Sequence, residues 1–584
     1  MDLGPGEAVL RSPLQVLLPR FVSRRCGVTM GDLQESHPKA PAARSARWIG
    51  AAASAVVLLL LTLVLQWASG AYSCEFGGHP DEPAHFVTGL LVRDYVAAGA
   101  PPNPMRFAEN YYLHYPKVAF GHWPPAFYIV QALWTLVFPV SRLSLMLLMA
   151  VLITVSGLLL QQAVAQEHGA VAGLVAACFL VSIPEVQLSA DRVMAEAPVA
   201  LFSLAALIWF ARYLRTERWR DAAGFAAFSA AAILTKGVAL ALAAVPLVSV
   251  MATRRFSLLR KASFWMPAVA VAVICAPAYL LLPVSGVAYY SKAHGVVVSL
   301  GSVFSLAPYL SRQMGLVAAL LCGVGLFLWL WDAIHGSAAP GMPGVSGALV
   351  VGYVVIRVVV VAARDDRHVV MIAGPLIILA ASGAAWAARR LRLFRWATPA
   401  GLLLAAVAVF LATAWRVPHK PYFGLDVVAA DLLAASSSSP EVLLISSDSA
   451  GEGVFVSEVA MRESRPGRYV LRASKVLSRS YWSGRHYELL LRTSGAVAKY
   501  LDSVPVAAVV LSFRPGAVSM AHHALLHDAL RANPEVWQER EYRNSSGDRL
   551  GDRILVYHRR VPLSSPRPHI RVDLQYELGR TLEN

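Results

Sequence analysis

The sequence predicts a polytopic α-helical membrane protein that ends in a smaller α/β domain. Its 584 residues are 57% hydrophobic and only 15% charged, whereas roughly a quarter of the residues of an average soluble domain carry a charge. The mean hydropathy is +0.53, and apolar runs long enough to cross a bilayer recur up to about residue 416. Residues 417–584 return to ordinary polarity. These observations exclude a chain of soluble domains.

The amino-terminal segment precedes the first membrane span. Residues 1–45 are polar, rich in Pro and Ala and without a long apolar run, so we expect a disordered cytoplasmic tail. The stretch from Trp48 to Trp67 is almost continuously apolar, and about 20 residues at about 1.5 Å each match the hydrocarbon thickness of a bilayer. A cleaved signal peptide has a shorter apolar stretch nearer the start. The pattern therefore predicts an uncleaved span with its basic end inside.

The transmembrane region, residues 46–416, is interrupted by a polar and aromatic external loop at 70–125. The apolar piece from Ala126 to Phe138 is too short to cross, so we expect an interfacial helix there. Further spans are predicted at 143–160, 169–183, 193–211, 222–235, 237–252, 264–282, 314–331, 345–361, 368–386 and 397–415. The chain then has about eleven spans.

Charge distribution predicts how the spans are oriented. The chain carries 52 Lys and Arg against 36 Asp and Glu, an excess that would also suit nucleic acid or anionic lipid. The positive charge gathers in three short connections, at 212–220, 253–261 and 389–395, as the positive-inside rule requires of cytoplasmic loops. We therefore expect no nucleic-acid partner. The sequence predicts a multi-pass plasma (inner) membrane protein with a cytoplasmic amino terminus and an extracytoplasmic carboxy-terminal domain.

The carboxy-terminal domain, residues 417–584, combines strand and helix patterns. Continuous apolar runs at 441–447 and 506–513 are typical of buried strands, and 552–558 alternates as a strand. Helical periodicity covers 493–501 and 521–532. The domain has no phosphate-binding loop and no nucleophile elbow, so we assign it no chemistry of its own. Five scattered cysteines support neither a disulfide framework nor a zinc site.

Polar residues that hydrocarbon would exclude gather on the predicted outer side of the membrane. They lie in the loop after the first span and in three later turns. They are Asp81, Glu82, His85, His122, Asp191, Glu196, Lys236, Asp366 and Arg367. Acids from two segments and cations from two others could thus converge above the bilayer. Such a layout suits a reaction on a lipid phosphate.

The order of these motifs resembles the GT-C membrane glycosyltransferases. The likeness covers roughly residues 46–416 and is strongest to the protein-mannosyltransferase and lipid A aminoarabinose-transferase branch. It rests on the Asp-Glu after the first span, HWPP at 122–125, the outward Asp191, Thr-Lys-Gly at 235–237 and Asp-Arg-His-(x)6-Pro at 366–375. The family usually has Arg-Tyr where this chain has Arg367-His368.

The resemblance implies a hexosyl- or pentosyltransferase that moves a sugar from a polyprenyl-phosphate donor to an acceptor protein, lipid or glycan at the extracytoplasmic membrane face. A carboxylate must accept the proton of the acceptor hydroxyl, and fixed cations must stabilise the departing phosphate. We expect Asp81, with Glu82 and Asp191, to be catalytic, and Lys236 and Arg367 to bind the donor phosphate. Candidates for substrate binding are His85, His122, Glu196 and Asp366.

Each of these assignments has a simpler alternative. Asp81 and Glu82 could merely open a helix from Pro83 to Tyr95, since Asp before Glu-Pro is a good helix start. Lys236 could snorkel from a helix end. No cofactor is required, although the His79, Asp81, Glu82 and His85 side chains include donors suited to a divalent cation.

Two other functions fit a polytopic chain. A lipid or solute transporter or flippase would show internal repeats and midplane charges, whereas here the ionisable residues cluster at one face. An anchored assembly subunit with an inactive membrane part would not need the outward acids. Both rank below the transferase.

Overall fold

The structure is a computed structural model that describes residues 40–281, 298–360, 364–391, 398–435, 441–480, 486–514, 520–543, 553–561 and 569–584. The chain divides into two compact units, Met1–Gly50 and Ala51–Asn584. Most of the predicted amino-terminal tail lies outside the described residues. The first described helix begins at Ala40, before the predicted boundary at residue 46.

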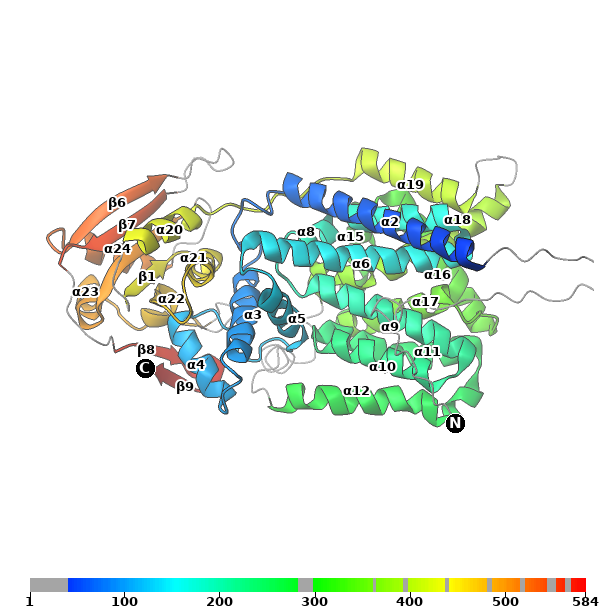
Figure 1. Ribbon diagram of the computed structural model, residues 1–584, viewed down its shortest axis with the longest axis horizontal. Helices are drawn as coiled ribbons and strands as arrows, with labels where there is room; N and C mark the ends of the chain where they lie inside the picture. Colours follow the sequence, from blue (N-terminus) through cyan, green and yellow to red (C-terminus); the bar gives the residue numbers. More distant parts are fainter. Residues whose placement is uncertain are drawn as a thin grey trace, which may run out of the picture. The chain divides into compact units, whose positions relative to one another are not determined.

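The membrane part is a bundle of helices (Figure 1). Its helices and 3-10 turns are α2 (Ala40–Ala68), α6 (Arg142–His168), α7 (Ala170–Ser182), α8 (Pro184–Ala190), α9 (Glu196–Thr216), α10 (Trp219–Ile233), η1 (Gly237–Ala243), α11 (Ala244–Thr253), η2 (Phe256–Arg260), α12 (Ala262–Leu281), α14 (Gly301–Phe304), α15 (Leu306–Met314), α16 (Leu316–His335), α17 (Met342–Val359), η4 (Asp366–Val369), α18 (Val370–Arg390) and α19 (Pro399–Thr413). Among the long apolar helices α18 is the most enclosed, since 89% of the residues in its apolar stretch are buried.

Seven helices in the described part of the chain are long and apolar enough to cross a membrane, or eight if α7 and α8 form one broken span. Helices α7 and α8 meet at an angle of 69°, because Pro184 begins a new helix where α7 ends. Three shorter apolar helices, Ala126–Val137, Gly237–Thr253 and Pro399–Thr413, complete the set. The multi-span architecture is confirmed, whereas the exact count of about eleven stays a prediction.

Two buried helices orient the site within the bundle. Helix α9 begins at Glu196 and ends beside Arg215, and α18 follows Arg367 and ends in Arg389 and Arg390. Each helix has 21 residues and so spans roughly 30 Å. Their basic ends therefore lie at the opposite end of the bundle from the acids and cations at their starts.

The external loop folds into two helices before the apolar pattern resumes. Helix α3 (Glu82–Ala97) matches the predicted helix from Pro83 to Tyr95, and α4 (Pro104–His114) follows it. Helix α5 (Ala126–Val137) has 12 residues and is too short to cross a bilayer. Figure 1 shows α3 and α5 between the helix bundle and the carboxy-terminal domain, with α4 alongside that domain.

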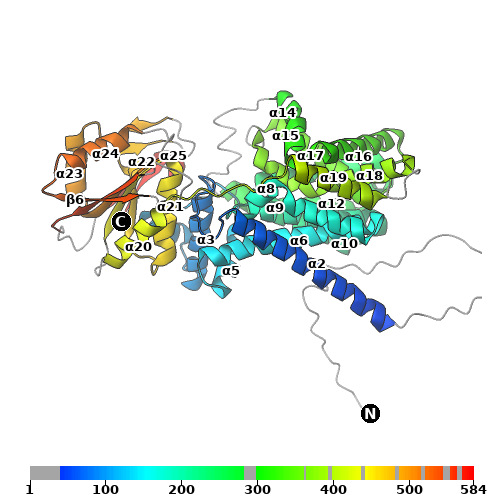
Figure 2. The ribbon, with the colours of Figure 1, turned by 90° about the horizontal axis from the view of Figure 1, so that it is seen from above.

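The carboxy-terminal domain is an α/β fold around a five-stranded sheet of order β2-β1-β5-β7-β6. Strands β2, β1 and β5 are parallel to one another, β7 runs antiparallel to β5, and β6 runs antiparallel to β7. The elements are α20 (Leu425–Ala435), β1 (Val442–Ser446), α21 (Ser449–Arg462), β2 (Tyr469–Arg472), α22 (Ala473–Val476), β3 (Ser478–Arg479), β4 (Glu488–Leu489), α23 (Ser494–Ser503), β5 (Val506–Phe513), α24 (Ala521–Arg531), β6 (Trp537–Arg543), β7 (Arg553–Arg559), β8 (Arg571–Leu574), α25 (Gln575–Leu578) and β9 (Arg580–Glu583). Helices cover both faces of the sheet (Figure 2).

The carboxyl ends of the parallel strands face the external loop. Arg472, at the end of β2, donates from Nη1 to the Pro116 carbonyl oxygen at 3.3 Å. The guanidinium of Arg514, just beyond β5, lies 4.0 Å from the ring centroid of Phe423. In open α/β sheets this edge is where ligands bind. Here Pro116 of the external loop and Phe423, just before α20, contact it.

Reporter fusions test the orientation that the charges predict. Fusions at residues 217, 257 and 391 should report a cytoplasmic location, because these positions lie at the basic end of the bundle. A fusion at residue 480, in the carboxy-terminal domain, should report the opposite side. Alkaline phosphatase and fluorescent-protein activities measure the two outcomes. A cytoplasmic signal at 480 would contradict the predicted topology.

Candidate active site

Asp81 stands at the amino-terminal end of α3, but its side chain does not cap the helix. It occupies the cap position and makes no side-chain capping bond. Its Oδ2 instead accepts hydrogen bonds from Nη1 and Nη2 of Arg367, both at 3.1 Å. Nδ1 of His79 lies 3.4 Å from the same oxygen. The capping alternative therefore does not describe the Asp81 carboxylate, which is used to contact a cation 286 residues away in the sequence.

Arg367 joins this carboxylate to two others. Its Nε lies 2.7 Å from Oδ2 of Asp365 and 3.4 Å from Oε1 of Glu196. Glu196 also pairs with the ammonium of Lys236. Asp81, Glu196, Lys236, Asp365 and Arg367 thus form one connected group, which we call the charge cluster. The structure brings together the predicted Asp81, Lys236 and Arg367 from three separate segments.

Local structure explains how each member reaches the cluster. Glu196 is the first residue of α9, where the positive end of the helix dipole favours a carboxylate. Lys236 lies in the break between α10 and η1, and Arg367 lies in the short turn η4 that opens α18. Asp365 caps that turn by accepting the backbone N–H of Arg367 at 3.2 Å. Three helix ends therefore converge on one point.

Burial and charge act in opposite directions on these groups. Burial alone would raise the pKa of the Asp81 carboxyl, but Arg367 and His79 outweigh it and hold that pKa at about 2. Burial lowers the pKa of the Lys236 ammonium even though Glu196 opposes the change. Asp81 is consequently ionised across the physiological range.

An imidazole and aromatic wall lies beside the charge cluster. The His85 ring is 4.3 Å from the Trp123 ring between centroids, and its Nδ1 is 3.2 Å from the Tyr128 hydroxyl. Burial lowers the pKa of His85 to about 3 and of His122 to about 4, although Asp81 opposes both changes. Both histidines are therefore neutral hydrogen-bonding groups at pH 7.

Glu82 and Asp191 belong to a different group of contacts. Oε1 of Glu82 accepts from Nζ of Lys420 at 2.8 Å and from the Val193 N–H at 3.0 Å. Its Oε2 accepts from the Gly78 N–H at 2.8 Å. Asp191 is buried, and burial raises its pKa to about 7 against the influence of Ser69 and Lys420. These two predicted catalytic acids lie with Lys420, while the contacts of Arg367 are with other carboxylates.

Within the segment of η4, Arg367 pairs with Asp365, a residue that the sequence did not single out. The predicted Asp366 points elsewhere, with Oδ1 2.7 Å from Nη2 of Arg357, and nearly half of its side chain is exposed. Adjacent acids project in different directions, and sequence alone did not separate them. The run Arg364-Asp365-Asp366-Arg367 was the only available signal.

Lys117 is a second residue that the predicted site lacks. Its ammonium is buried, and burial together with Arg472 lowers its pKa to about 7, while Asp81 and Glu452 raise it. A Cβ on Gly453 of α21 would come within 2.9 Å of Cε of Lys117. Lys117 therefore connects the surroundings of Asp81 to the carboxy-terminal domain. The proximity of Lys117 to Gly453 depends on tertiary packing, which a local sequence pattern does not predict.

The described residues contain no group of three or more His, Cys, Asp or Glu side chains arranged to hold a metal ion. The four donors that the sequence suggested divide between two environments. His79 and His85 lie beside Asp81 of the charge cluster, whereas Glu82 pairs with Lys420.

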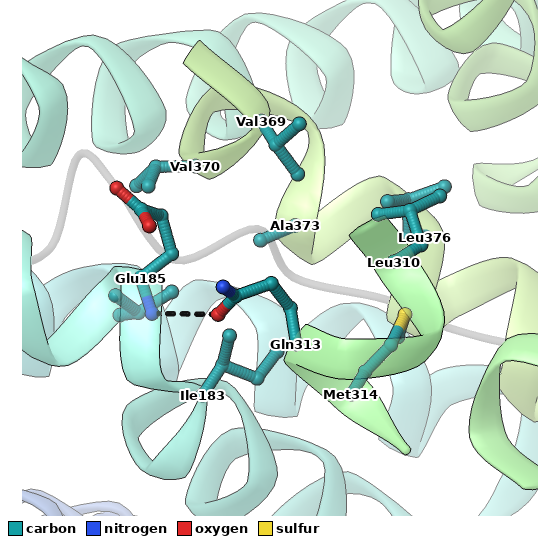
Figure 3. Close-up of a pocket in the computed structure, with 10 residues that line it drawn as sticks. Ile183, Glu185, Leu310, Gln313, Met314, Val369, Val370, Ala373 and Leu376 are labelled. Carbon is teal, nitrogen blue, oxygen red and sulfur yellow. Dashed lines mark hydrogen bonds between the residues drawn. The ribbon is translucent and has the colours of Figure 1, made fainter. Parts of the chain in front are cut away.

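An apolar pocket is lined in part by Val369 and Val370, which follow Arg367 and His368 in the sequence (Figure 3). It is lined by Ile183, Glu185, Val186, Leu310, Gln313, Met314, Val369, Val370, Ala373 and Leu376. Glu185 is its polar element, with Oε2 2.8 Å from the Tyr309 hydroxyl and its N–H donating to Oε1 of Gln313 at 3.1 Å. A second pocket shares Val186 and Val370 and continues along α18 to Pro375.

Comparison with known proteins assigns this architecture. Residues 122–281 match the family described as dolichyl-phosphate-mannose-protein mannosyltransferase. The crystal structure of ArnT from Cupriavidus metallidurans bound to undecaprenyl phosphate aligns at a TM-score of 0.51 and 14% identity, over 86% of this chain and 97% of that chain. The chain has a GT-C fold.

The same fold appears in the archaeal oligosaccharyltransferase AglB from Archaeoglobus fulgidus, solved with an inhibitory peptide and a dolichol-phosphate. That structure aligns at a TM-score of 0.51 and 11% identity, over 90% of this chain and 76% of that chain. No curated protein sequence matches the chain. The predicted GT-C architecture with a carboxy-terminal α/β domain is thus confirmed at the level of fold.

The ion pair between Asp81 and Arg367 should make stability depend on pH. The folded-state pKa of Asp81, about 2, lies below the ordinary value of about 4. The ion pair therefore contributes about 2 kcal/mol to the free energy of unfolding. This contribution is complete above pH 4 and is lost as the pH falls towards 2. We expect Asp81→Asn to lower the Tm at pH 6, and the difference from wild type to shrink below pH 4.

Thermal denaturation in detergent measures this difference at each pH. Asp94→Asn, on the same helix, provides a reference for removing a carboxylate elsewhere. A difference between wild type and Asp81→Asn that does not change between pH 6 and pH 3 would contradict the ion pair.

Proposed function

We propose that this protein transfers a sugar from a polyprenyl-phosphate donor to an acceptor hydroxyl at the extracytoplasmic face of the membrane. The observation that carries the proposal is the charge cluster, in which the partly buried carboxylate of Asp81, the partly buried guanidinium of Arg367 and the buried ammonium of Lys236 meet at one end of a membrane helix bundle. The GT-C fold supports it.

The donor would bind where charge adjoins apolar surface. Lys236 and Arg367 supply fixed positive charge for the phosphate. The apolar residues that follow Arg367 and His368 line a small pocket, which would have to widen to admit the prenyl chain. Fixed cations in a water-poor site stabilise developing phosphate charge more strongly than they would in water. ArnT and AglB have been solved with undecaprenyl phosphate and a dolichol-phosphate, which supports a lipid of the same chemical class.

Asp81 is the group best placed to act as the base. The acceptor oxygen forms a bond to the anomeric carbon, and its proton passes to the Asp81 carboxylate. The bond between the anomeric carbon and the phosphate oxygen breaks, and that oxygen leaves with the electron pair as a phosphate monoester. Lys236 and Arg367 stabilise the extra negative charge of the monoester.

Arg367 couples the two halves of this reaction. Its pairing with Asp81 keeps the pKa of that carboxyl low, which makes Asp81 a weak base. A donor phosphate would share the guanidinium with Asp81, so donor binding would raise the basicity of Asp81. We therefore propose that the donor binds before the acceptor is deprotonated.

The transporter alternative fits the charges less well. A transporter site is expected near the bilayer midplane between repeated halves. Glu196 instead stands in the first turn of α9, and Arg367 stands in η4, directly before α18. We retain the transferase as the single proposed function.

Substitution of the base tests the mechanism. Asp81→Asn keeps the size of the side chain but removes the proton acceptor, so kcat for transfer from a purified polyprenyl-phosphate sugar should fall about 10³-fold. Sugar transfer is measured by mass spectrometry of acceptor fractions from the cell envelope. Asp94→Asn should retain activity, because Asp94 pairs with Arg93 and Arg465. Undiminished turnover in Asp81→Asn would remove Asp81 from the mechanism.

Substitution of a cation tests donor binding. Lys236→Met should weaken the affinity for polyprenyl phosphate about 10- to 100-fold, because one charged hydrogen bond to phosphate is lost. Affinity for the acceptor should change less. Direct binding of labelled polyprenyl phosphate in detergent measures the effect, and Lys261→Met at the opposite end of the bundle is the matched lysine control. Unchanged donor affinity in Lys236→Met would contradict the assignment.

A further inference from the structure

The segment that leads from α19 into the carboxy-terminal domain is bound to the loop that carries Asp81. Lys420 lies in this segment, and its ammonium pairs with Glu82 at 2.8 Å, with both side chains completely buried. The backbone N–H of Lys420 donates to the Ser69 carbonyl oxygen at 2.8 Å. The carboxy-terminal region therefore begins with a buried cation that is bound by Glu82 of the external loop.

Glu82 also accepts hydrogen bonds from the backbone of two segments that carry site residues. Besides Lys420, its carboxylate accepts the Gly78 N–H at 2.8 Å, three residues before Asp81, and the Val193 N–H at 3.0 Å, three residues before Glu196. One carboxylate thus fixes the segments that carry two members of the charge cluster. Without Lys420 it would be a buried charge lacking its counterion.

A second carboxylate reinforces the attachment. Glu75 is buried and accepts the N–H groups of Phe423 at 2.8 Å and Leu425 at 2.9 Å. These groups are at the start of α20, where a helix end favours an anion. Glu75 and Glu82 therefore hold residues 420–425 at two points. The position of the loop that carries Asp81 therefore depends on the linker, which supplies hydrogen-bond donors to both carboxylates.

We propose that Lys420 is a positioning residue for the transfer reaction, which it supports by holding Glu82 and so fixing Asp81 relative to Arg367. The proposal rests on the proposed function for its kinetic test. Lys420 contacts Glu82 and is completely buried, so it acts through Glu82. The carboxy-terminal domain, for which the sequence suggested no chemistry, would then be required for the geometry of the site.

The kinetic test compares two cations of the carboxy-terminal region that each pair with a carboxylate of α3, the buried Glu82 for Lys420 and the partly buried Asp94 for Arg465. Lys420→Met should lower kcat about 100-fold, as expected for a displaced catalytic group, while KM for the donor changes less than about threefold. Lys420→Arg should recover most of the rate because it keeps the charge. The matched control Arg465→Met breaks the pair with Asp94 at the far end of α3 and should leave kcat near wild type.

A second measurement does not depend on activity. Hydrogen–deuterium exchange of peptides covering residues 76–86 and 190–196 should quicken in Lys420→Met, because the bonds from Gly78 and Val193 to Glu82 are no longer fixed. Arg465→Met should not change these peptides. If wild type transfers no sugar from polyprenyl phosphates, the proposed function fails, and the exchange result still decides the role of Lys420.

Three results would overturn the proposal. They are a wild-type kcat in folded Lys420→Met, an effect confined to KM, and equal exchange in the 76–86 peptide. If Lys420→Met does not fold, Lys420→Met/Glu82→Gln removes the unpaired charge and allows the same measurements. Wild-type kcat and exchange in that double variant would equally overturn the proposal.

Discussion

The structure depends on the placing of one guanidinium. Arg367 touches Asp81, Asp365 and Glu196, and through Glu196 it is linked to Lys236. Charges buried at a membrane edge are costly unless they are paired. Their mutual compensation therefore determines where the external loop, α9, the break before η1 and the start of α18 can lie relative to one another. The chemistry proposed for the site uses the same charges that hold these segments together.

Much of this arrangement could be predicted from the sequence. Hydropathy located the spans because hydrocarbon excludes polar groups, and the buried strand 506–513 matched β5 in both of its ends. Asp81, Lys236 and Arg367 were identified because each is an ionisable group close to an apolar segment, on the predicted outer side of the membrane. Each of these inferences uses a local signal that a single segment carries.

The remainder needed the fold. Asp365 and Asp366 are neighbours with the same chemistry, and the turn η4 decides which one meets Arg367. Glu82 pairs with Lys420 across 338 residues, and no periodicity reports such a contact. The number of spans is equally hard to predict, because a proline breaks α7 from α8 and a 3-10 turn opens the segment Gly237–Thr253. Hydropathy responds to composition and cannot detect where a helix bends.

The two long buried helices have a consequence for the surrounding lipid. Helices α9 and α18 begin at or directly after members of the charge cluster and end near arginines. Their length therefore sets a distance of about 30 Å between the charge cluster and the basic end of the bundle. Thinning the bilayer would leave the reacting groups standing higher above the acyl chains, while a prenyl tail would stay immersed in them. The thickness of the host membrane thus becomes part of the alignment between enzyme and donor.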